Sequence, residues 1–118
     1  MRRGLLLLAI LTSALDAHHS TAPYDMTREA TVSGVVTKFY WANPHAYIYI
    51  DVKDPDGVQQ WSIEIESPNL LRHQGWTKDT LKAGDEIVCK GARAKIQTNY
   101  AMKCFIVELP DGRQLRAQ

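Results

Sequence analysis

The sequence has no excess of either charge and no familiar catalytic motif. Fourteen basic and 13 acidic residues give a formal net charge of +1. Without residues 1–17 the counts become 12 and 12 (14 − 2 and 13 − 1), so the remainder is formally neutral. Nucleic-acid-binding domains usually carry a basic excess, and we therefore expect no nucleic-acid partner. The chain has no serine–histidine–acid order, phosphate loop or HExxH motif, so we predict no catalytic residues and no enzyme.

The chain also lacks an apolar run long enough to span a membrane. The apolar segment Leu5 to Leu15 has 11 residues, whereas a spanning helix needs ~20. Arg2 and Arg3 precede this segment, and the small residue Ala17 follows it. That order is typical of a cleaved signal peptide, with a membrane anchor as the alternative. We therefore expect residues 1–17 to be removed and the mature protein to be periplasmic or secreted, with no membrane attachment.

Only two cysteines are present, Cys89 and Cys104. In an exported protein such a pair predicts one disulfide. If the strands that contain them form a hairpin, residues whose numbers sum to 193 face each other, as these two do. The alternative is two small buried side chains that never pair.

Alternating apolar and polar residues predict a protein made mostly of strands. The apolar phase shifts at Gly34, which predicts a bulge or a sharp bend in the first strand. DPDG at residues 54–57 predicts a tight turn between the second and third strands. The expected strands cover residues 30–41, 46–53, 58–66, the later part of 81–94, and 101–109, with a final turn and short strand or tail at 110–115.

A short helix is expected after the third strand. Ser67 and Pro68 form a typical helix start, a capping residue followed by proline in the first turn. Leu70 and Leu71 are expected on its buried side, and Gly75 is expected to end it.

Three strands, a short helix and two further strands are the element order of an oligonucleotide/oligosaccharide-binding (OB) barrel. We therefore predict an all-β fold with one short helix, a small OB-like five-stranded barrel over residues 30–118. An N-terminal arm at residues 18–29 is expected to precede it. A β-sandwich is the alternative, because periodicity does not separate the two folds at this length.

Several short motifs occur together in the chain: an HHS sequence at 18–20, WANPH at 41–45, GW at 75–76 and LKAGD at 81–85. In this combination the sequence resembles domain of unknown function family 6152, a family of small exported bacterial proteins. The resemblance extends from residue 18 to about residue 112. It implies export and one compact β-domain, and it assigns no activity. The two cysteines are not part of the family pattern, so the disulfide prediction is specific to this sequence.

The adjacent histidines His18 and His19 directly follow the expected cleavage site. Cleavage after Ala17 would give His18 a free amine beside its imidazole, and the two groups could chelate one metal ion. Neutral imidazole suits copper, zinc and nickel, and copper(II) competes best for such nitrogen ligands. His45, in the turn after the first strand, could complete the site. The alternatives are a solvated terminus, a loop histidine bonded to its own backbone, and an earlier cut after Ala14.

Other polar and aromatic residues have simpler interpretations. His73 lies at the end of the expected helix, where a cation is favourable next to the helix dipole. Tyr47 and Tyr49 share one strand face and could stack a sugar or base, or merely cover the sheet. Glu64 and Glu66 also share a face and could act as an acid–base pair, but such alternation usually marks a solvated face.

The sequence therefore favours an exported binding module whose most specific ligand is copper(II), held by His18, His19 and His45. The alternative is a metal-independent module that binds an oligosaccharide, peptide or protein on the face of Tyr47 and Tyr49. A hydrolase that uses two glutamates is a third class. Copper is the only cofactor expected, and the partner is an unspecified periplasmic protein or small molecule.

Overall fold

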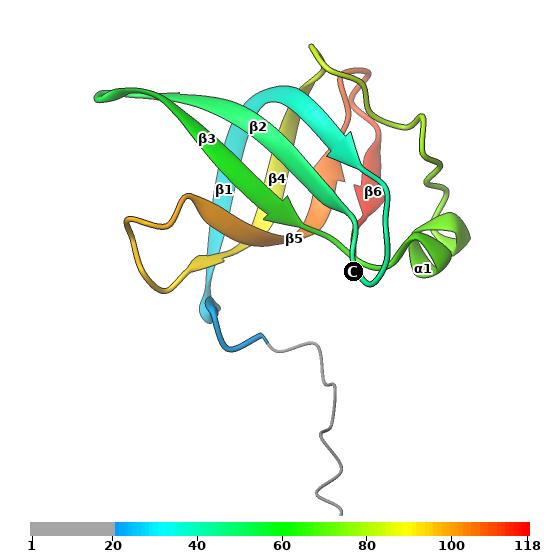
Figure 1. Ribbon diagram of the computed structural model, residues 1–118, viewed down its shortest axis with the longest axis horizontal. Helices are drawn as coiled ribbons and strands as arrows, with labels where there is room; N and C mark the ends of the chain where they lie inside the picture. Colours follow the sequence, from blue (N-terminus) through cyan, green and yellow to red (C-terminus); the bar gives the residue numbers. More distant parts are fainter. Residues whose placement is uncertain (1–20) are drawn as a thin grey trace, which may run out of the picture.

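The computed structural model describes residues 21–118, and in these residues six strands and one helix follow the predicted order. Five strands close into a mixed β-barrel, and a short sixth strand extends it (Figure 1). The OB-like prediction is confirmed, and the β-sandwich alternative is not adopted. The elements are β1 (Tyr24–Tyr40), β2 (Tyr47–Asp54), β3 (Gly57–Glu64), α1 (Pro68–His73), β4 (Glu86–Ala94), β5 (Ala101–Glu108) and β6 (Gln114–Arg116).

The long strand β1 is shared by both sides of the barrel. Its Val35 pairs with Asp51 of β2 and also with Glu86 of β4. A Cβ atom on Gly34 would lie 2.5 Å from the carbonyl oxygen of Asp51, so glycine permits this close approach where the strand bends. The register shift between β1 and β2 lies between Val36 and residue 38, slightly beyond the predicted position. The strand also begins at Tyr24, before the predicted start at residue 30.

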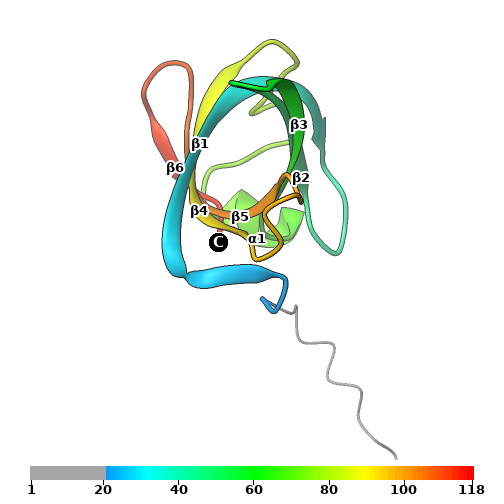
Figure 2. The same cartoon turned by 90° about the vertical axis from the view of Figure 1, so that its left-hand side faces the viewer.

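The barrel closes through a parallel pairing of β3 with β5. Ser62, Ile63 and Glu64 lie opposite residues 101–103, and the other neighbouring strands pair in antiparallel fashion. Figure 2 shows the strands as a ring. The β2–β3 turn lies at Asp54–Gly57, as predicted, and Gly57 has a φ of 118°, which favours glycine.

The inward positions of the strands form the core, and α1 lies beside one end of the barrel (Figure 1). The hydroxyl of Ser67 accepts a hydrogen bond from the backbone N–H of Leu70, which confirms the predicted helix start. Leu71 is fully buried but Leu70 is 49% exposed, so one of the two predicted leucines packs in the core. Within residues 21–118, no helix is long and apolar enough to cross a membrane. The largest fully buried core side chains are Trp76, Ile48, Ile50, Ile63, Ile65 and Leu71.

Cys89 and Cys104 are buried, separate thiols, so the predicted disulfide is not formed in the structure. A register shift after Lys90 places Cys89 opposite Val107 and Cys104 opposite Gly91, which corrects the predicted pairing. Hydrogen bonding to the Cys104 thiol, together with burial, raises the pKa of Cys89. The two thiols therefore pack as small neighbouring core side chains.

Candidate functional site

The segment between β1 and β2 carries His45, whose side chain is 6% exposed. It follows the cis peptide bond Asn43–Pro44. The next residue, Ala46, donates its N–H to the carbonyl of Glu66 at 3.1 Å and accepts from the N–H of Ile65 at 3.0 Å. These two backbone bonds fix His45 against the segment that follows β3.

The imidazole of His45 lies between two carboxylates. Its Nδ1 donates to Oε1 of Glu64 at 2.6 Å, and its Nε2 is 3.7 Å from Oε1 of Glu66. The glutamate side chains are only 13% and 20% exposed. The interpretation of Glu64 and Glu66 as a solvated face is therefore wrong, because His45 covers both. A proton on Nδ1 leaves Nε2 as the basic nitrogen of the neutral ring.

Glu64 on β3 is the centre of a polar network whose other members come from four further segments. Its Oε1 also accepts from the Tyr47 hydroxyl at 3.4 Å, and Tyr24 hydrogen-bonds to the same carboxylate. Lys103, only 8% exposed, is its register partner on β5. Burial alone would raise the pKa of Glu64, but hydrogen bonds from Tyr24 and His45 and the charge of Lys103 outweigh it. The pKa therefore lies below its usual value, and the carboxylate stays ionised.

The pKa values of the two tyrosines in this network shift in the opposite direction, upward. Burial, together with the hydrogen bond to Glu64 and its negative charge, raises the pKa of Tyr24. Burial and the charge of Glu64 also raise the pKa of Tyr47. Both hydroxyls therefore remain protonated donors to the carboxylate over a wide pH range.

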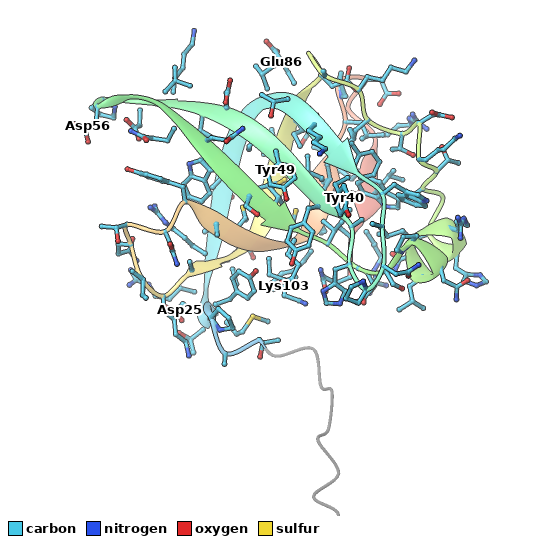
Figure 3. All side chains as sticks on the ribbon, in the orientation of Figure 1. Asp25, Tyr40, Tyr49, Asp56, Glu86 and Lys103 are labelled. Atoms are coloured by element: carbon cyan, nitrogen blue, oxygen red, sulfur yellow. The ribbon has the colours of Figure 1, made fainter. Side chains whose placement is uncertain are left out.

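Next to the network, the outer face of the barrel is aromatic. Tyr47 and Tyr49 share this face as predicted, with ring centroids 6.4 Å apart and planes at 20°. Tyr40 lies opposite Tyr47 on β1 and is 47% exposed, and the ammonium of Lys38 lies 5.2 Å from the centre of its ring. Figure 3 shows Tyr40, Tyr49 and Lys103 on this side. The aromatic face and the polar network therefore form one continuous surface.

Two of the three predicted metal ligands, His18 and His19, lie outside the described residues, as does the predicted signal peptide. The third, His45, is described above, whereas His73 is exposed at the end of α1. Within residues 21–118, no group of three or more histidine, cysteine or acidic side chains could hold a metal ion.

Sequence reasoning missed Tyr24 and Lys103 as members of the network. Tyr24 precedes the first clear apolar alternation, so no pattern assigned it to a strand. Lys103 lies between Met102 and Cys104 on an alternating strand, where a lysine is expected to face solvent, so no signal in the sequence indicated its 8% exposure.

No curated protein matches the chain. A family model described as "Family of unknown function (DUF6152)" matches residues 6–101, which is more than half of the 118 residues. The match includes His45, Glu64 and Glu66 but ends before Lys103. The chain therefore belongs to this family of unknown function.

Proposed function

We propose that this protein is an exported binding module that holds one copper(II) ion between His18, as the first residue of the mature chain, and His45. The observation that carries the proposal is the hydrogen bond from Nδ1 of His45 to Glu64. Histidines that bind metals usually donate their second ring N–H to a carboxylate or carbonyl, which fixes the tautomer and orients the ring. Glu64 does this for His45 and directs Nε2 toward Glu66.

The local charges also favour a cation at this point. Nε2 of a neutral ring and the Glu66 carboxylate are both electron-rich, and their atoms are 3.7 Å apart. That separation is compatible with two ligands of one ion whose bonds are about 2 Å long. Glu66 is therefore a candidate oxygen ligand beside His45, and sequence reasoning did not foresee it. A mixed set of nitrogen and oxygen ligands suits copper(II).

The arm can bring His18 to the site. Tyr24 hydrogen-bonds to Glu64, so the chain six residues after His18 is already anchored beside His45. An extended chain spans up to ~3.5 Å per residue, which is about 20 Å over this segment. The amine and Nδ1 of His18 supply two nitrogen ligands, and His19 supplies another imidazole if the chain turns.

Calorimetric titration of the exported protein with copper(II) tests this proposal, after its intact mass has confirmed a start at His18. We expect one ion per chain. Replacing His18→Ala, or adding one alanine before His18, should weaken binding at least ~10-fold, because both remove the chelate. His45→Ala should weaken it at least ~10-fold, because it removes a direct ligand and loss even of a residue that orients a ligand typically costs ~10- to 100-fold. Affinity should also fall below about pH 6.5, where an ordinary imidazole takes up a proton.

His73→Ala is the matched control, because it removes an exposed histidine remote in sequence from the arm. Circular dichroism should show that all variants remain folded. Equal copper affinity for wild type, the extended protein and the His18 and His45 variants would refute the proposal. Loss of binding in the His18 variants alone would leave a terminal chelate and exclude His45.

A second candidate function is metal-independent binding of an oligosaccharide on the face of Tyr47 and Tyr49. The nearly parallel rings favour it, with exposed Tyr40 alongside. Aromatic faces stack on planar or ring-shaped ligands at modest cost in side-chain entropy. Titration of oligosaccharides against metal-free protein should then quench tyrosine fluorescence, and Tyr49→Ala should abolish the change. Tyr100→Ala is the control, because Tyr100 packs against Trp61 elsewhere on the barrel.

A further inference from the structure

A groove on the outside of the β1 bend supports an inference independent of the metal site. We propose that it binds a basic, partly apolar peptide segment of a partner protein. The groove has a volume of about 760 Å³, within the range of binding sites for ligands in proteins. Figure 3 shows Glu86, on its rim, at the opposite side of the molecule from Lys103 of the polar network. The side chains that carry the proposal are Val35, Asp51, Lys53, Val58, Glu86 and Glu108.

Two aliphatic side chains are exposed in this groove. Val35 of β1 is 39% exposed and Val58 of β3 is 58% exposed. Both face outward, because side chains alternate along a strand and the core residues Val36 and Trp61 lie one and three positions away from them. Exposed valines that line a concave surface provide apolar area for a ligand to bury, unlike valines scattered singly over a convex surface.

Carboxylates surround these valines in a regular pattern. Val35 lies directly between Asp51 and Glu86 in the sheet register, so one carboxylate flanks it on each side. Glu108 adds a third carboxylate, and Lys53 is the only basic side chain among the lining residues. The groove therefore has a formal net charge of −2. At about 4.8 Å between strands, the Cα atoms of Asp51 and Glu86 are roughly 10 Å apart.

This pattern fits a peptide that carries both lysine and aliphatic side chains. An aliphatic group can pack on Val35 while lysine side chains on either side of it reach the carboxylates, and lysine stems can cover apolar surface.

The probe for this proposal is the acetylated, amidated peptide Lys-Val-Lys-Val-Lys, titrated into ¹⁵N-labelled exported protein and followed by NMR. We expect chemical-shift changes at the groove residues that weaken as salt is added. Peptides in which glutamate replaces lysine, or serine replaces valine, should bind at least ~10-fold more weakly. Each tests one half of the pattern, the charge and the apolar contact.

Two exposed positions allow variants that keep the fold. Glu86→Lys and Val58→Ser should each reduce the affinity of the lysine–valine peptide at least ~10-fold. Asp79→Lys is the matched control, an equal charge change at an exposed residue that does not line the groove, and it should leave affinity within about twofold. The proposal is overturned if the glutamate peptide shifts the same amides equally. It is overturned too if both groove variants bind as tightly as the control.

Discussion

Replacing Glu64 by glutamine tests whether one partly buried charge organises the polar network. The substitution keeps size and one acceptor oxygen but removes the negative charge that faces Lys103 and accepts from His45 at 2.6 Å. Hydrogen bonds to charged groups contribute about 1.5–3 kcal/mol each. Removing one partner of a fully buried ion pair costs about 3–5 kcal/mol, which is an upper limit here because the Glu64 side chain is 13% exposed. The glutamine oxygen retains part of the bonding, so we expect the free energy of unfolding to fall by about 2–4 kcal/mol.

Urea unfolding followed by tryptophan fluorescence measures this loss. With a slope of roughly 1–3 kcal/mol/M, the expected change lowers the midpoint by on the order of 1–2 M. Glu86→Gln is the matched control, because Glu86 is exposed, and it should change stability by less than about 0.5 kcal/mol. The variant Lys103→Met removes the ammonium and keeps most of the apolar stem. Combined with Glu64→Gln, it should destabilise by at least about 1 kcal/mol less than the sum of the single changes.

Equal urea midpoints for Glu64→Gln and Glu86→Gln would refute a stabilising role for the Glu64 charge. Strictly additive changes at Glu64 and Lys103 would show that the lysine does not depend on the carboxylate. A loss of stability with additive changes would leave the hydrogen bonds from His45 and the tyrosines as the source of the effect.

Three further predictions concern protonation and thiol reactivity. Because folding lowers the pKa of Glu64, its stabilisation is complete above the ordinary glutamate pKa near 4.3 and is lost as the pH falls through the lower pKa of the folded state. The variant Glu64→Gln should therefore lose less free energy of unfolding than wild type when the protein is acidified. Folding raises the pKa values of Tyr24 and Tyr47, so their stabilisation is complete below about pH 10 and is lost as the pH rises through the pKa values of the folded state. Ultraviolet titration should show that two of the five tyrosines ionise at higher pH than the others. Cys89 and Cys104 should resist a thiol reagent in native protein and give two free thiols after denaturation without reductant, whereas no free thiols would show a disulfide.

Much of the fold could be predicted because its signals are local. The alternation of Ile48 and Ile50 with outward tyrosines determines which side of β2 enters the core. The DPDG turn sets the hairpin register, and Ser67 with Pro68 starts the helix at the predicted place. Each of these features depends on residues close in sequence, so the order of elements was enough to identify an OB-like barrel.

The errors arise where distant strands determine the outcome. The start of β1 around Tyr24 has mostly exposed side chains, and its pairing with β4 makes it a strand. The disulfide prediction placed the β4–β5 turn so that paired residue numbers sum to 193, whereas the observed pairs sum to 195 from Gly91–Cys104 to Arg93–Met102 and to 196 from Val88–Glu108 to Lys90–Ile106. This register separates Cys89 from Cys104 along the ladder, and the sequence of neither strand alone reveals it.

The polar network shows why a site of this kind is hidden from periodicity. Glu64 appears as a solvent-facing residue on an alternating strand, and Lys103 and Tyr24 also look like ordinary surface residues. The parallel closure of β3 on β5 brings Lys103 next to Glu64, and the β1–β2 segment lays His45 over it. The outer side of the barrel thereby acquires a partly buried charge that joins β3 to four other segments of the chain. Such a charge is costly to bury unless its partners are fixed, so the network that holds it also fixes the orientation of His45.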